Sequence, residues 1–275
     1  MSTLPATPPA WEARMRVNQA RVALSEWTKL HSLRSTRWSM LVAVVLTIGL
    51  PALFGAVISS HWGHMRPGER AHRKPLDIAL AGVNLSQLAI GVLGVLVITG
   101  EYSTGMIRAT IAAVPRRLEV LWGKIAVFAA VTLCLMVPSV LAAFFASQAI
   151  VGHIHELHVS LSDPGVARTV VGGALYLTVF GVFALALGAI TRNTAAGIAT
   201  LVAIFFVIPP ILELGLPTSW NNAISPYLPS NAGRDVFSLT TGSNSLSPWG
   251  GFALFVGYTA IAIAISALLL LRRDT

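Results

Sequence analysis

Long apolar runs without charged side chains constrain this chain more than any other feature. Five runs contain no Asp, Glu, Lys, Arg or His, and a sixth carries only Glu213 near its end. A helix needs about 20 apolar residues to cross a hydrocarbon core of roughly 30 Å. The runs do not alternate polar and apolar residues, which disfavours a membrane β-barrel. The sequence therefore predicts an all-α membrane protein with six transmembrane helices, at residues 39–60, 78–100, 125–150, 169–190, 195–214 and 250–271.

The scarcity of charge supports the same fold class. Only 11% of the residues are charged, whereas a soluble domain carries about 25%. So few charges cannot coat a water-soluble surface, and lipid is the natural solvent for the rest. The net charge of +8 does not indicate nucleic acid, because the basic residues lie mostly between the apolar runs, where membrane orientation explains them.

Proline occurs inside several of these runs. Pro51 and Pro138 each remove one helical hydrogen bond and predict kinks. The pair Pro209-Pro210 lies near the end of the fifth run. It predicts either a real interruption of that helix or a tolerated kink, since proline is frequent in membrane helices.

The distribution of Lys and Arg predicts the orientation. With the N-terminus inside, cytoplasmic segments hold thirteen basic residues and outer segments hold six. The loop 61–77 is an exception to this bias, because it places four basic residues outside. The overall bias predicts a multi-pass protein of the cell (plasma) membrane with both termini in the cytoplasm.

The region before the first span divides into two parts. Residues 1–10 are rich in Pro, Ala and Thr and predict a disordered tail. Residues 11–37 predict an amphipathic helix at the cytoplasmic interface, ahead of a six-helix domain at 38–275. The alternative is a solvated cytoplasmic helix that touches no lipid. The apolar positions of this helix recur at three- and four-residue spacing: Val17, Ala20, Leu24, Trp27 and Leu30.

The segment 101–119, between the second and third spans, is the most informative for function. Its apolar positions Ile107, Ile111 and Val114 predict a short amphipathic helix, and Pro115 ends it. Glu101 is expected near the start of this helix and Arg116-Arg117 after its end, where their charges complement the helix dipole. Such an element on the cytoplasmic face is suited to a groove on another protein.

Four motifs, in order along the chain, resemble those of the type-2 membrane subunits of ATP-binding-cassette exporters, especially actinobacterial ones. The resemblance covers roughly residues 20–273. Its motifs are Ser25-Glu26-Trp27-Thr28-Lys29-Leu30; Glu101-Tyr102 with Gly105-Met106-Ile107-Arg108-Ala109-Thr110; Pro115-Arg116-Arg117 leading to Lys124; and Leu228-Pro229-Ser230-Asn231-Ala232-Gly233.

The resemblance implies a permease subunit that pairs with a second copy or a paralogue and docks on a separate cytoplasmic ATPase. Glu26, Trp27 and Lys29 would lie in the interfacial helix, and segment 215–249 would hold short re-entrant helices. ATP and Mg would bind the partner chain and no cofactor would bind this one. Residues implied in ATPase coupling are Glu101, Tyr102, Gly105, Ile107, Arg108, Thr110, Ile111, Arg116 and Arg117.

The chain's own residues agree with that division of labour. Its single Gly-Lys pair, Gly123-Lys124, has Leu118 where a Walker A loop needs its first glycine and Ile125 where it needs Ser or Thr. This mechanism of cradling ATP is therefore excluded. We accordingly expect a transport subunit rather than an enzyme.

Polar residues in the spans suggest a substrate path. Asn84 and Gln87 in the second span, Tyr176 in the fourth and Glu213 in the fifth are its candidate residues. The alternative for the first three is hydrogen bonding between helices, and Glu213 alternatively lies at the outer interface.

The histidines His153, His155 and His158 suggest either an outer metal site or solvated loop residues. They are one residue short of the zinc-protease pattern.

Three other functions compete with an exporter. A secondary transporter usually needs ionisable groups at mid-membrane, and an intramembrane enzyme needs a nucleophile, acid pair or metal there. All seven His and all four Asp lie outside the predicted spans. A non-ATP-driven membrane transporter and an assembly or immunity protein both remain as alternatives at this stage.

Overall fold

A computed structural model of the chain describes residues 19–106, 117–239 and 245–272. It is 87% helical, and no strand occurs within those ranges. Six helical segments are long and apolar enough to cross a membrane, which confirms the predicted fold class. They are α3 (Arg34–His61), α5 with α6 (Pro75–Ala79 and Ala81–Ser103), α8 (Arg117–Val151), α9 (Val166–Thr191), α10 through α11 (Thr194–Val202 and Ile208–Gly215) and α14 (Pro248–Arg272).

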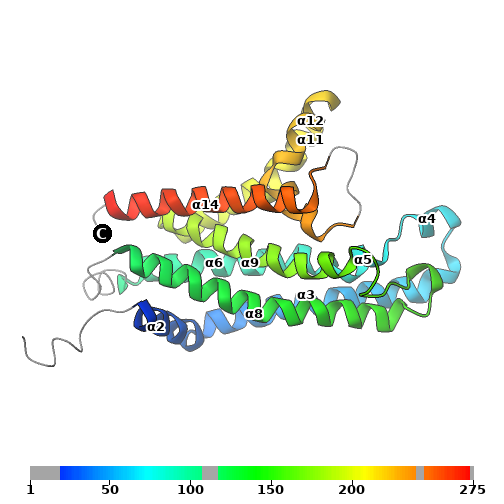
Figure 1. Cartoon of the computed structure of the whole chain (residues 1–275), viewed down its shortest axis with the longest axis horizontal. Helices are drawn as coiled ribbons and strands as arrows, with labels where there is room; N and C mark the ends of the chain where they lie inside the picture. The colour runs from blue at the N-terminus through cyan, green and yellow to red at the C-terminus, as the bar shows by residue number, and fades with distance from the viewer. Residues whose placement is uncertain (1–18, 107–116, 240–244, 273–275) are drawn as a thin grey trace, which may run out of the picture.

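Shorter elements mark the two ends of the bundle (Figure 1). The helix α2 (Gln19–Ser32) lies at the same end as the last turn of α14, and α4 (Pro67–Ala71) lies at the other. We call these the α2 end and the α4 end. The remaining short elements are η1 (Trp62–His64), η2 (His155–Leu157), η3 (Ala203–Val207), α12 (Thr218–Ile224), η4 (Ser225–Tyr227), α13 (Pro229–Arg234) and η5 (Asp235–Phe237).

The helix α9 forms the centre of the bundle. It packs against α6, α8, α10 and α14, and it is the most buried of the six spans. Its Tyr176 and Phe180 are fully buried and contact Phe237, Phe255 and Phe205. This aromatic cluster joins α9 to α14 and to the segment between α11 and α14.

Glycines allow α6 and α9 to approach closely. A Cβ built on Gly94 of α6 would collide with the backbone carbonyl oxygen of Gly181 on α9. A Cβ on Gly181 would lie 2.7 Å from the ring of Phe128 on α8. The absence of side chains at these two positions therefore sets the spacing of three helices.

The N-terminal helix ends earlier than predicted. Leu33 is extended, with φ −77° and ψ 120°, and it separates α2 from α3. Residues 34–37 therefore belong to the first spanning helix, not to the helix predicted at 11–37. Residues 1–18, including the predicted tail, lie outside the described part of the chain.

The fifth span changes its helical pitch just before the double proline. Its residues 203–207 form a π-helix, η3, and Pro209 and Pro210 open α11. The prolines follow Phe205 and Phe206 by four residues, where their rings would clash with helical carbonyls. The wider π-helical turn avoids these clashes. The α-helical hydrogen-bond pattern is therefore interrupted, but the helix continues from Thr194 to Gly215.

The segment between α11 and α14 contains the predicted short helices. The elements α13 and η5 return to the bundle and pack against α14 and α9. In contrast, α11 and α12 project away from the other helices (Figure 1). The segment thus holds short helices, as the resemblance implies, and of these α13 and η5 pack against the bundle.

Candidate functional site: a buried ion cluster at the α2 end

Four charged residues from three helices meet at the α2 end of the bundle. Glu26 and Lys29 come from α2, Glu101 from the last turn of α6, and Lys124 from near the start of α8. We call them the ion cluster. Lys29 Nζ lies 2.7 Å from Glu26 Oε1 and 2.9 Å from Glu101 Oε1. Lys124 Nζ lies 2.5 Å from Glu26 Oε2 and 2.9 Å from Glu101 Oε1.

The ion cluster is buried and electrically balanced. The side chains of Glu26, Lys124 and Glu101 are only 2%, 3% and 7% exposed, and Lys29 is 28% exposed. Two carboxylates and two ammonium groups sum to zero formal charge. Removing one partner from such a buried set typically costs about 3–5 kcal/mol, because it leaves an uncompensated charge. The cluster therefore joins α2, α6 and α8, and we expect the loss of any one of its charges to destabilise this junction.

Lys29 has a raised pKa. Burial alone lowers the pKa of its ammonium group, but hydrogen bonds from Lys29 to Glu26 and Glu101, together with their negative charges, outweigh that effect. Lys29 is therefore protonated throughout the physiological range.

Apolar packing next to the ion cluster seats α2 on α8. Leu30 is buried against Val127 and Val131 of α8. Because Glu26 and Leu30 are four residues apart, they share one face of α2. The exposed Leu24 and Trp27 lie on another face. The apolar stripe predicted for this helix is thus divided: Leu30 faces the bundle, while Leu24 and Trp27 face away from it.

The end of α6 also contacts the corner between α9 and α10. The Arg192 guanidinium lies 5.2 Å from the ring centroid of Tyr102. Thr194 Oγ1 donates a hydrogen bond to Thr99 Oγ1 at 2.8 Å. Arg192 itself adopts a left-handed backbone with φ 53° at the end of α9. The last turns of α6 therefore connect α2, α8, α9 and α10.

A cavity of about 350 Å³ lies beside the ion cluster. Both Glu26 and Glu101 line it, together with residues of α3 such as Thr36. Glu101 Oε2 is buried and has no hydrogen-bond partner among the described residues. Both lysines of the cluster bind the other oxygen, Oε1, and the cavity lies on the α3 side of the cluster.

Glu101 was expected near the start of the short helix in segment 101–119, and the structure places it in the last turn of α6. This helix continues to Ser103, and the chain then turns at Thr104 and Gly105. Gly105 has φ 71°, a conformation that favours glycine and ends the helix. Glu101 therefore contributes to the ion cluster, and the expected helix at 107–114 lies outside the described residues.

Most of the predicted coupling residues cannot be placed. Ile107, Arg108, Thr110, Ile111 and Arg116 lie outside the described residues, and Arg117 is the first residue of α8. Both flanks of this segment are nevertheless known. Glu101 precedes it and Lys124 follows it, and these two residues form an ion pair.

The four predicted substrate-path residues do not line one path. Tyr176 Oη donates a 2.5 Å hydrogen bond to Gln87 Oε1 in the buried core. Asn84 is exposed on α6, and Glu213 is exposed on α11. The Gln87–Tyr176 pair therefore matches the alternative, a hydrogen bond between helices. Gln87 Nε2 also donates a hydrogen bond to the backbone carbonyl of Asn84, but the Asn84 side chain is exposed. Glu213 lies away from the pair, because α11 projects from the bundle.

The histidines do not assemble into a metal centre within the described residues, where no three His, Cys, Asp or Glu side chains come together. His153 Nε2 lies 3.4 Å from Ser59 Oγ. All three of His153, His155 and His158 are exposed.

The sequence did not single out three residues that contact α2 or the end of α6 here: Lys124, Arg192 and Thr194. A usable signal existed for Lys124. It is a lone cation at the edge of an apolar run, and Glu101 is a lone anion at the edge of the preceding run on the same predicted side. Lone opposite charges at adjacent span ends predict pairing, since burial of either alone is costly.

These features define the class of the molecule. It is a multi-pass helical membrane protein whose N-terminal helix is tied by buried ion pairs to two of its six spans. No family model matches the chain, and a comparison with curated proteins finds no match.

Proposed function

We propose that the chain is the permease subunit of an ATP-binding-cassette exporter in the plasma membrane. In this proposal two such subunits, identical or paralogous, form the substrate path. Each docks on a separate cytoplasmic ATPase, which binds ATP and Mg. The α2 end with both termini faces the cytoplasm, as the bias of Lys and Arg favours.

One observation carries the proposal: the ion cluster connects both flanks of segment 104–116 to α2. Glu101 anchors the helix before the segment and Lys124 anchors the helix after it. Glu26 binds Lys124, and Lys29 binds both carboxylates. A force applied to the segment is therefore transmitted to α2, α6 and α8 together, as coupling to a moving partner requires.

The proposed mechanism uses this rigidity. ATP binding draws two ATPase subunits together, and their motion moves the segments docked on them. Because α6 packs along the central helix α9, a displacement of its last turn reaches the middle of the bundle. The spans then change from an inward-facing to an outward-facing arrangement.

The alternatives are a membrane transporter that does not use ATP and an assembly or immunity protein. The buried Gln87–Tyr176 pair is neutral, but the charged side chain of Arg234 lies against Tyr176. Ion-driven transport usually relies on ionisable groups at mid-membrane, so this pair does not separate the exporter from ion coupling. A co-purifying ATP-binding-cassette ATPase would separate the exporter from both alternatives.

The test alters the proposed docking segment and measures how much ATPase remains associated with the chain. The chain is purified from its native membranes, and the associated ATPase is quantified and reconstituted with the chain. We expect the pair Ile107→Asp with Arg108→Glu to lose the associated ATPase and its substrate-stimulated activity. A control pair at the α4 end, Gly68→Asp with Arg66→Glu, makes the same charge change and should retain both. Intact activity in the docking variant would contradict the proposal.

A further inference from the structure

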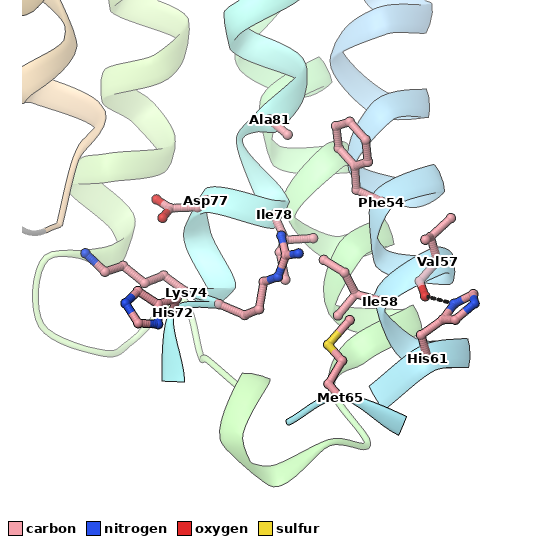
Figure 2. Close-up of a pocket in the computed structure, with 11 residues that line it drawn as sticks. Phe54, Val57, Ile58, His61, Met65, His72, Lys74, Asp77, Ile78 and Ala81 are labelled. Atoms are coloured by element: carbon pink, nitrogen blue, oxygen red, sulfur yellow. Dashed lines mark hydrogen bonds between the residues drawn. The ribbon is translucent and has the colours of Figure 1, made fainter. Parts of the chain in front are cut away.

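A second cavity lies at the α4 end, far from the ion cluster. It has a volume of about 560 Å³ and lies between the last turns of α3 and the segment that leads through α5 into α6. Figure 2 shows Phe54, Ile58 and His61 along one side and His72, Lys74 and Asp77 along the other. The cavity thus has an apolar wall and a polar wall.

The apolar wall continues along a membrane-spanning helix. Phe54, Val57 and Ile58 are spaced three and four residues apart on α3, so they share one face. Ile58 and Ile78 are buried at the base of the cavity. Phe54 and Val57 are 42% and 49% exposed on the flank of α3, where lipid surrounds the bundle. The cavity therefore extends toward the region that acyl chains occupy.

The polar wall is cationic. Arg73 and Lys74 line the cavity, and Asp77 is the one acid among its lining residues. With both histidines neutral, two cations and one carboxylate give a net charge of +1. The wall therefore favours an anion.

The two histidines are held in place by the backbone. His61 Nδ1 lies 2.9 Å from the Val57 carbonyl oxygen, and His72 Nδ1 lies 2.7 Å from that of Gly68. A carbonyl oxygen can only accept, so in each ring Nδ1–H is the donor.

The same loop breaks the charge pattern of the rest of the chain. Residues 61–77 carry four basic side chains on the side where the orientation bias expects few. These four charges are the exception to the orientation bias. Two of the four, Arg73 and Lys74, line the cavity.

We propose that this cavity binds an anionic amphiphile. Its acidic head group lies at Arg73 and Lys74, and its acyl chain lies along Phe54, Val57 and Ile78. Charge-assisted contacts fix the head, and burial of the chain against the apolar wall adds affinity. The site is independent of the exporter proposal, because it requires only the cavity and a surrounding membrane.

The test is lipid binding to the purified full chain, measured by native mass spectrometry. Four probes are titrated: phosphatidylglycerol, phosphatidylcholine with the same chains, dodecyl phosphate, and glycerol 3-phosphate. We expect one site that prefers an anionic amphiphile over phosphatidylcholine and ignores glycerol 3-phosphate. Preference for phosphatidylglycerol identifies a membrane lipid, and preference for dodecyl phosphate identifies a single-chain amphiphile; either result supports the site. Equal binding of phosphatidylcholine, or competition by glycerol 3-phosphate, overturns it.

Variants locate the binding site. Arg73→Gln should weaken anionic binding at least about tenfold, the loss expected for one charge-assisted contact. Arg66→Gln removes the same charge from the same loop outside the cavity lining and should leave affinity unchanged. Phe54→Ser alters only the apolar wall and should also weaken the binding of the anionic amphiphiles. Equal effects of Arg73→Gln and Arg66→Gln would mean diffuse loop charge and would overturn the proposal.

Discussion

Glu26 organises the ion cluster because its two carboxylate oxygens bind different lysines. Oε1 accepts from Lys29 on the same helix, and Oε2 accepts from Lys124 on α8. Glu101 accepts from both lysines through a single oxygen. Each residue thus depends on partners from other helices, and the energetic consequence of a substitution depends on which charge remains unpaired.

Lys124→Gln should strongly destabilise the chain. It leaves the buried carboxylates of Glu26 and Glu101 with Lys29 alone, and breaking such a pair costs about 3–5 kcal/mol. Thermal unfolding in detergent measures the loss. The double variant Glu26→Gln with Lys124→Gln restores neutrality and should recover much of it. A double variant no more stable than Lys124→Gln alone would contradict this account.

The contribution of Lys29 should depend on pH in one direction. Its folded-state pKa is raised above the ordinary value of 10.5. A raised pKa means that stabilisation is fully present below pH 10.5 and is lost as the pH rises through the folded-state pKa. The stability difference between the wild type and Lys29→Gln should therefore stay constant from neutral pH upward and shrink above pH 10.5. A difference that shrinks at neutral pH would exclude these ion pairs as its source.

The elements of this fold follow from local signals to different degrees. Each of the six predicted spans lies within one of the six observed spanning segments, since apolar length is a local property. The break at Leu33 and the turn at Gly105 were missed, because helical periodicity on both sides hides a single residue that leaves the helix. The ion cluster was also missed as a unit. Glu26 and Lys124 are 98 residues apart, and no single window of sequence contains both.

The crossing of α6 and α9 gives a prediction at the same scale. Gly94→Ala should destabilise the bundle by about 1–3 kcal/mol, because the added methyl group meets the Gly181 backbone, which cannot move aside without shifting α9. The matched control is Gly257→Ala on α14, where nothing lies within 4 Å of the new Cβ. It should be neutral or slightly stabilising. Thermal unfolding of both variants measures the contrast, and equal effects would show that the crossing is not tightly packed.

The molecule as a whole separates two chemistries at its two ends. The α2 end holds a neutral, buried ion cluster that joins helices, and the α4 end holds a cationic cavity next to an apolar wall. Between them, the central helix α9 packs against most of the bundle. The proposed coupling and the proposed amphiphile site therefore lie on opposite sides of the membrane, so a variant at one end should leave the other function intact.

The sidedness of the chain tests the central claim most directly. Cys134 is replaced by Ser, and single cysteines are introduced as Arg108→Cys, Arg116→Cys and His64→Cys. Intact cells are then treated with a thiol reagent that does not cross membranes. We predict labelling of His64→Cys in intact cells and of the other two only after permeabilisation. If Arg108→Cys and Arg116→Cys were labelled from outside intact cells, segment 104–116 would not meet a cytoplasmic ATPase, and the exporter proposal would be contradicted.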